Sequence, residues 1–230
     1  MKDFKDVRVV GAVMVHDDSD YTKLVLDNMA KFTKEIYVNL NDPTPEAEKV
    51  VLEHPAVVSH IYTTNGGGRW NQGVQREKTV RMLDDIKPDI ILFPDSDELY
   101  PPNLTEQLEK FWADEEAKTF WFRLLYLWGD ENHFRNDGLF KSIHHVRAFK
   151  WQPGIVYVPK YCGYALPRTY LDSKRFHSNL PTMHYGYEKE INRVRKYGRA
   201  NCNYCDSEYR DKVDAGMIIE ELPEELKHYV

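Results

Sequence analysis

Four short apolar segments alternate with three helical stretches over the first hundred residues, and this alternation is the strongest constraint on the fold. The apolar segments are predicted strands at residues 7–15, 35–39, 57–62 and 89–93. Helical spacing of apolar residues is found between them, from about residue 19 to 32, from residue 45 onward and from about residue 70 to 86. A β-α-β-α-β-α-β order predicts an α/β fold with three layers, α/β/α, and a mostly parallel central sheet.

Polar clusters follow all four predicted strands. They occupy residues 16–20, 39–42, 65–69 and 95–98. Ligands of open α/β sheets bind beyond the carboxyl ends of the parallel strands. Because four polar strand ends would meet at one edge, the sequence predicts a ligand site there.

The second half of the chain has a different pattern. A helix is expected over residues 104–114, strands over 120–128, 146–150 and 155–159, and a charged helix over 188–203. No low-complexity linker and no internal repeat interrupts the sequence. We therefore expect one domain over residues 1–230, with a nucleotide-binding half at 1–103 and a smaller acceptor-facing half at 104–230.

Charge and composition exclude several classes of protein. The net charge of −6 disfavours a broad electrostatic grip on nucleic acid, and the basic run at 193–199 is expected to be a solvated helix face. No apolar stretch of ~18 residues predicts a membrane span, and the first residues lack the apolar core of a signal peptide. With only three Cys, Cys202 and Cys205 are interpreted as reduced thiols, with half a zinc site or a redox pair as the alternative. A cytoplasmic protein is expected.

Three carboxylates crowd into four residues after the fourth predicted strand, in the sequence Asp95-Ser96-Asp97-Glu98. Like charges this close repel one another, so a cation is expected beside them. Hard divalent cations take oxygen ligands and bridge phosphate oxygens. The alternative is an ordinary acidic turn or a helix cap.

This segment, followed by Leu-Tyr-Pro-Pro, resembles the DxD motif of family 2 glycosyltransferases with the GT-A fold. Upstream, the Gly-rich turn at 65–69, Arg76 and the strand at 88–92 are similar to that family's turn, Arg-bearing helix and DxD strand. Residues 9–17 are similar to its first strand, whose end contacts the nucleotide. The resemblance covers roughly residues 7–105. It implies metal-dependent transfer of a sugar from a nucleotide-sugar to an acceptor hydroxyl, with inversion preferred.

By this resemblance, Asp97 would bind Mn²⁺ or Mg²⁺, and Asp95 would face the metal or the ribose. His184, in the late sequence Met-His-Tyr-Gly-Tyr, would be a further metal ligand, although a lone His is more often structural. The metal would bridge the diphosphate of the donor and stabilise the leaving group. The other residues implied in donor binding are Val15, His16, Asp17, Asn39, Asn41, Gly67, Arg69, Arg76 and Ser96.

The donor base is left open by the end of the second strand. Many family members carry an Asp pair there, whereas this chain has Asn39 and Asn41. Asn can hydrogen-bond a uracil or a guanine edge, so a UDP-sugar or a GDP-sugar is expected. The acceptor is expected to be a saccharide or another hydroxyl compound, and the oligomeric state stays open.

An inverting transferase needs a carboxylate that takes the proton of the acceptor hydroxyl. Asp130 and Glu131 are the best candidates, and Asp137 is a third. All three lie in a polar stretch after an aromatic-rich strand, where Trp128 could stack on a sugar ring. The alternative is an ordinary polar loop.

Two rival functions share some of these features. A nucleotidyltransferase also has an α/β sheet and metal-binding acids, but it usually carries a Gly-rich basic signature after the first strand, where this chain has His16-Asp17-Asp18. A non-catalytic carbohydrate-binding protein on the same fold would not need both the DxD motif and His184.

Overall fold

The structure is a computed structural model that describes residues 2–16, 19–64, 71–157, 166–190, 217–227 and 229. Asp17, Gly67 and Arg69, which the sequence implicates in donor binding, lie outside the described residues. Cys202, Cys205 and almost all of the charged helix predicted at 188–203 also lie outside them.

Four parallel strands form the first half of the sheet, as the sequence predicts. They are β1 (Val9–Val15), β2 (Ile36–Asn41), β3 (Val57–Thr63) and β4 (Ile90–Leu92). Their order is β3-β2-β1-β4, and every neighbouring pair among them is parallel. The carboxyl ends of all four strands therefore point to one edge.

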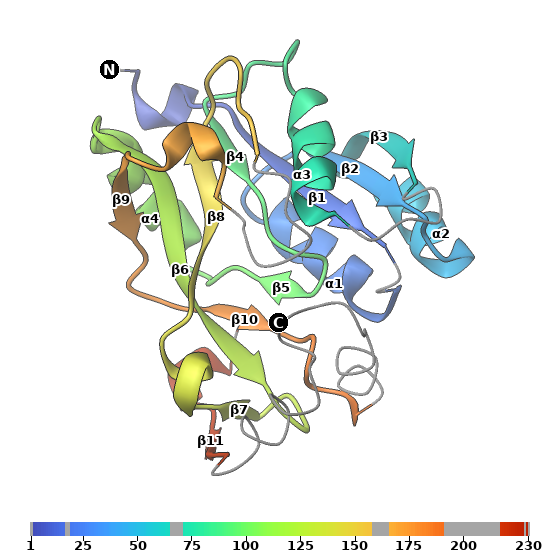
Figure 1. The fold of residues 1–230 in the computed structure, drawn as a ribbon, viewed down its shortest axis with the longest axis vertical. Helices are drawn as coiled ribbons and strands as arrows, with labels where there is room; N and C mark the ends of the chain where they lie inside the picture. Colours follow the sequence, from blue (N-terminus) through green and yellow to red (C-terminus); the bar gives the residue numbers. More distant parts are fainter. Residues whose placement is uncertain are drawn as a thin grey trace.

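Helices cover both faces of this sheet, which confirms the three-layer α/β class. On one face α1 (Ser19–Ala30), α2 (Pro45–Glu53) and α4 (Leu104–Ala113) bury their apolar residues against alternate side chains of the strands. On the other face α3 (Gln72–Arg81) contributes to a second, smaller core. In Figure 1, α3 lies in front of β1 and β2, while α4 lies behind β6. Among the described residues, no helix is long and apolar enough to cross a membrane.

The second half of the chain extends the same sheet. Strand β8 (His144–Lys150) pairs antiparallel with β4, and the long strand β6 (Ala117–Leu127) pairs antiparallel with β8. Parallel to β6 run β9 (Lys174–His177) and β10 (Thr182–His184). The remaining short elements are β5 (Glu98–Leu99), β7 (His133–Arg135), β11 (Ile219–Glu221), and the 3-10 helices Phe4–Asp6, Gly138–Lys141, Arg168–Tyr170 and Glu224–Leu226.

One predicted strand is wrong over its described part. Residues 155–157 of the segment predicted at 155–159 form no strand. The backbone N–H of Val156 donates to the hydroxyl of Thr169, and that of Tyr157 donates to a carboxylate oxygen of Glu77. Because side chains satisfy these donors, the segment needs no neighbouring strand.

Helix α3 begins where its sequence provides a cap. The side chain of Asn71 accepts a hydrogen bond from the N–H of Val74 at 3.1 Å, which satisfies one of the unpaired donors of the first turn. This fixes the start of the helix, and with it the position of Arg76 one turn later. The face of α3 that carries Arg76 is buried against the sheet.

A candidate active site at the carboxyl edge of the parallel strands

The carboxyl ends of β1, β2 and β4 meet at one place. The His16 ring nitrogen Nδ1 lies 2.5 Å from the carbonyl oxygen of Asn41, which joins the ends of β1 and β2. After β4 the chain continues alongside β1, with Asp95 in a parallel bridge to Met14. The acidic segment then turns into β5, so the structure brings together three of the four polar strand ends that the sequence predicts.

Asp95 is held between two buried arginines. Its Oδ1 accepts a hydrogen bond from Arg76 of α3, and its Oδ2 accepts one from Nη2 of Arg147 on β8 at 2.8 Å. Burial opposes ionisation of Asp95, but the two guanidinium charges outweigh it and hold its pKa well below the ordinary value. Because both oxygens are bonded to arginine, the geometry favours Asp95 as an anchor for the segment over a role as metal ligand.

Arg147 is aimed at the site by a β-bulge. The pairing of β6 with β8 shifts by one residue, from Phe120 opposite Ala148 to Trp121 opposite Val146, so Arg147 has no opposite partner. Bulges of this kind turn a side chain away from the regular alternation of a strand. The guanidinium of Arg147, 1% exposed, also makes a bidentate contact with the carboxylate of Glu98.

Glu98 is fully buried beside these charges. Burial, together with the negative charges of Asp95 and Asp97, raises its pKa to about 7 against the opposing pull of Arg147. Its Oε2 also accepts the backbone N–H of Asp95 at 3.0 Å. Arg147, Glu98 and Asp95 thus fix the turn that carries Asp97.

Asp97 and His184 face each other across this turn. Both residues are buried, and Oδ2 of Asp97 lies 3.8 Å from Nε2 of His184. The pairing of β10 with β5 brings His184 opposite Glu98, and the Tyr185 N–H donates to the carbonyl oxygen of Asp97. The structure therefore joins two residues that are 87 positions apart and that the sequence assigns to one metal site.

The hydrogen bonding of the His184 ring bears on that assignment. Its Nδ1 accepts the backbone N–H of Gly186 at 3.1 Å. A neutral ring that accepts at Nδ1 carries its proton on Nε2, the nitrogen that faces Asp97. In this tautomer Nε2 is a donor, so His184 can ligate a metal only if the ring loses its bond from Gly186 and changes tautomer.

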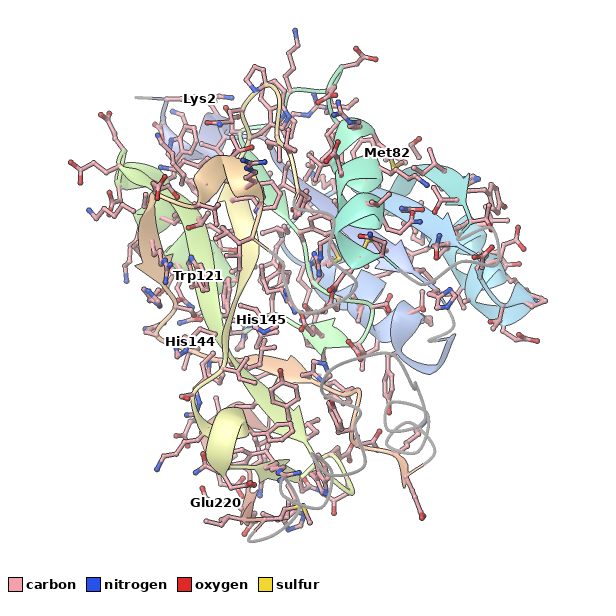
Figure 2. The ribbon with its side chains drawn as sticks, in the orientation of Figure 1. Lys2, Met82, Trp121, His144, His145 and Glu220 are labelled. Carbon is pink, nitrogen blue, oxygen red and sulfur yellow. The ribbon has the colours of Figure 1, made fainter. Side chains whose placement is uncertain are left out.

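His145 is a neighbour of this cluster that the sequence does not single out. Nη2 of Arg147 lies 3.3 Å from its Nδ1. In Figure 2, His145 lies on the side of β8 toward β5, while His144 lies on the outer side. Burial lowers the pKa of His145 to about 3, helped by the positive charge of Arg147. The ring is therefore neutral at physiological pH and accepts at Nδ1.

This shift predicts a loss of stability in acid. Between pH 6.5 and pH 3 the unfolded chain binds a proton at His145 that the folded chain does not bind, so stability falls as the pH falls below 6.5. The variant His145→Gln keeps a neutral acceptor. Between pH 7 and pH 5 we expect its free energy of unfolding to fall by about 1–2 kcal/mol less than that of the wild type. Urea unfolding at the two pH values measures this. Equal losses in both proteins would contradict the prediction.

The residues assigned to donor binding have different environments. Val15 is a fully buried core residue, and Ser96 is buried in the acidic turn. Both N–H groups of the Asn39 side chain are used inside the fold, because Nδ2 donates to the Gln75 carbonyl and to the Thr79 hydroxyl. The Asn41 side chain donates to Thr63. These bonds favour a structural role for both asparagines over reading of a base.

Arg76 keeps donors that the described residues do not satisfy. It is completely buried, with its guanidinium 4.6 Å from the centre of the Phe93 ring. Its Nε and Nη1 have no hydrogen-bond partner among the described residues, whereas its Nη2 is bonded to Asp95. Unpaired donors on a buried cation are costly, so this side chain is suited to an anionic ligand.

The three candidate catalytic acids are not equivalent. Asp137 accepts two hydrogen bonds from Arg135, which lower its pKa. Asp130 accepts hydrogen bonds from His133 and from a backbone N–H, and these also lower its pKa. Glu131 is exposed and has no ion-pair partner among the described residues, and its negative charge contributes to the raised pKa of Tyr185, next to His184. Of the three acids, Glu131 has the features of a base.

Aromatic rings line the side of the site next to β10. Tyr126 lies 4.6 Å from His184 between ring centres, and Tyr187 stacks on Trp128 at 5.4 Å. The guanidinium of Arg135 lies 4.8 Å from the Trp128 ring centre. Because Tyr187 and Arg135 already contact the Trp128 ring, stacking of a sugar on it is less favoured than the sequence suggests.

The structure adds Arg147, Glu98 and His145 to the residues that the sequence singles out. Glu98 has a signal in the sequence, since it belongs to the acidic segment itself. The signal for Arg147 is weaker: a charged residue inside an otherwise apolar strand, Val146 to Phe149. A buried charge needs a partner, so an arginine at such a position predicts a buried acid nearby.

Comparison with known proteins does not reveal a family. No protein-family model matches the chain, and no curated protein matches it. Solved structures similar to the fold include S. aureus TarS 1-349 in complex with UDP-GlcNAc, with 16% identity and a TM-score of 0.41, covering 53% of this chain and 34% of that chain. The same protein in complex with UDP has 16% identity and a TM-score of 0.41, and its structure without ligand has 18% identity and a TM-score of 0.40. Each match covers 53% of this chain and 36% of that chain. The chain thus spans about a third of their length, and a likeness this remote decides nothing about function.

Proposed function

We propose that this protein is a glycosyltransferase that moves a sugar from a nucleotide-sugar to an acceptor hydroxyl with the help of a divalent cation. The observation that carries the proposal is the arrangement at the carboxyl edge: Asp97 facing His184, beside an Asp95 that two buried arginines hold. This edge is where open α/β sheets bind their ligands. The resemblance of the acidic segment and its preceding helix to family 2 glycosyltransferases supports the same function.

Charge supports a cation at Asp97. The guanidiniums of Arg76 and Arg147 pair with the carboxylates of Asp95 and Glu98, and Asp97 adds a third carboxyl group to the cluster. No group of three His, Cys, Asp or Glu side chains in the described part of the chain is arranged to hold a metal by itself. Mg²⁺ at phosphate sites is often held by one or two carboxylates, with the phosphates of the substrate completing the shell. Asp97 fits a site of this kind, in which one carboxylate and the phosphates of the donor hold the cation. The bound cation would stabilise the departing diphosphate.

The chain's own residues would hold the donor and the acceptor. Arg76 would donate its unpaired N–H groups to a phosphate oxygen, because that side chain is buried with a fixed orientation. His184, in the tautomer that the bond from Gly186 favours, would direct its Nε2–H toward the carboxylate of Asp97. Glu131 would take the proton of the acceptor hydroxyl as the new bond to the sugar forms. Direct displacement of this kind inverts the anomeric centre, and inversion is part of the proposal.

A donor assay tests this function. Purified protein is incubated with UDP- and GDP-sugars, with Mn²⁺ or with EDTA, and release of free nucleoside diphosphate is measured. We expect slow release from one donor, dependent on Mn²⁺, because water can replace a missing acceptor. Release of pyrophosphate from a nucleoside triphosphate and a sugar phosphate would instead indicate a nucleotidyltransferase. Sugar binding without any turnover, with or without an acceptor, would indicate a binding protein and overturn the proposal.

A further inference from the structure

A pocket lies at the opposite end of the sheet from the candidate active site. It has a volume of about 440 Å³ and lies at the amino end of β4, beside the carboxyl ends of α4 and β8. Its lining includes three lysines and two tryptophans, Lys87, Lys118, Lys150, Trp112 and Trp151. In Figure 2, Lys2, whose carbonyl oxygen accepts the indole N–H of Trp112, lies far from His145. Nothing in the proposed transfer reaction uses this pocket.

The positive charges around the pocket are not neutralised by the nearby acids. Among the described residues, none of the three lysines has an ion-pair partner. Two of the acids beside them are paired with other cations, Asp89 with Lys2 at 2.6 Å and Asp114 with Lys174 at 2.8 Å, while Glu115 forms no ion pair among the described residues. Burial, together with the positive charge of Lys118, lowers the pKa of Lys150 to about 8 against the opposing effect of Asp114 and Glu115. Lysines that repel each other in one pocket favour a bound anion.

Backbone carbonyls at the end of α4 fix two of these lysines. Nζ of Lys150 donates to the carbonyl oxygens of Trp112 and Asp114 at 3.2 and 2.7 Å. Nζ of Lys118 donates to the carbonyl oxygen of Glu115 at 2.8 Å. Lys150 caps the end of α4, whereas Lys118 binds a carbonyl of the turn that follows the helix. Each ammonium has three donors, so at least one on each stays available. These bonds therefore hold two ammonium groups in place for a ligand.

The tryptophans Trp112 and Trp151 give the pocket an apolar, flat wall. The ammonium of Lys150 lies 5.4 Å from the centre of the Trp112 ring, so charge and ring surface are adjacent. A ligand that fits both would carry an oxygen-rich anionic group next to a flat ring.

We propose that this pocket binds a small organic anion, a phosphate or carboxylate attached to a flat ring, with Lys87, Lys118 and Lys150 around the anionic group. The ring lies against Trp112 and Trp151. The volume is within the range of small-molecule sites. The site is independent of the proposed transfer reaction, so failure of one leaves the other intact.

The five indole N–H signals of the ¹⁵N-labelled full chain provide the test. Trp151→Phe and Trp112→Phe assign the two signals of the pocket, and the other three are internal controls. Phenyl phosphate, benzoate, inorganic phosphate and benzyl alcohol are each titrated. We expect phenyl phosphate or benzoate to shift the Trp151 and Trp112 signals in a saturable way, more tightly than inorganic phosphate or benzyl alcohol. The stronger of the two ring anions identifies the anionic group.

Variants separate a charged site from an apolar groove. Lys87→Gln and Lys118→Gln are each expected to lower the affinity for the tighter-binding ring anion roughly tenfold, because each variant loses one charge-assisted contact. Lys110→Gln, an exposed lysine of α4 outside the pocket, is the matched control and should change nothing. Lys150 is left intact because it caps α4. No saturable shift, equal affinity for benzyl alcohol or inorganic phosphate, or unchanged affinity in both lysine variants would overturn the proposal.

Discussion

Replacement of Arg147 by methionine is expected to lower the free energy of unfolding by about 3–5 kcal/mol, the largest stability effect of any single change at the site. Arg147 is 1% exposed and bonds to the carboxylates of both Asp95 and Glu98. Methionine fills much of the same volume but leaves the buried Glu98 without an arginine partner and Asp95 with Arg76 alone. Most of the loss comes from the uncompensated charge, since a buried carboxylate without a partner must be protonated or hydrated.

Urea unfolding of Arg147→Met beside Arg81→Met measures this loss. Arg81 also pairs with an acid, Glu77, but its side chain is 55% exposed, so we expect its removal to lower the urea midpoint far less. Adding Glu98→Gln to Arg147→Met should recover part of the stability, because the second change removes a stranded charge. If Arg147→Met and Arg81→Met unfold at the same urea concentration, the buried network does not stabilise the fold.

Local sequence signals predict the first half of the fold well. Strands β1, β2 and β4 are short and almost fully buried, whereas β3 is a largely exposed edge strand. Helices separate the four strands, so the pattern of apolar residues marks each element. Asn71 and the Thr44-Pro45 pair mark the beginnings of two helices with caps that a reader of the sequence can find. The convergence of His16, Asn41 and Asp95 follows from strand direction alone.

The second half depends on pairings that no local pattern encodes. Strands β5 and β10 are two and three residues long, and they pair with each other although they are far apart in the sequence. This pairing carries His184 to Asp97, so their proximity can be expected only by resemblance. The bulge at Arg147 breaks the two-residue alternation of β8, and for that reason periodicity does not reveal which way the guanidinium points.

The sequence also does not show which of the candidate catalytic acids is free to act as a base. Asp130, Glu131 and Asp137 are indistinguishable as acidic residues in a polar loop. Their difference arises from partners: Arg135 neutralises Asp137, and His133 bonds to Asp130. Glu131 keeps its charge unpaired among the described residues. Whether an acidic side chain can serve as a general base or is held in an ion pair thus depends on tertiary contacts.

Asp97→Asn is expected to lower Mn²⁺-dependent turnover of the donor by about 100-fold or more, the largest effect on activity. A metal that stabilises the leaving diphosphate contributes several kcal/mol, and each 1.4 kcal/mol is about a factor of ten in rate. Asparagine has the same shape as aspartate, so the fold is expected to persist, and an unchanged urea midpoint checks this. The amide keeps one oxygen but loses the charge that holds the cation.

His184→Gln is the matched variant, because glutamine keeps an N–H donor but does not replace imidazole as a metal ligand. If Nε2 of His184 donates to Asp97, as the bond from Gly186 to Nδ1 indicates, this variant should lose less than about tenfold in kcat/KM and need no more Mn²⁺ than the wild type. A large rise in the Mn²⁺ requirement of His184→Gln would make His184 a ligand in the other tautomer. Full Mn²⁺-dependent activity in Asp97→Asn would remove the metal from Asp97 and, with it, the chemical basis of the proposed transfer.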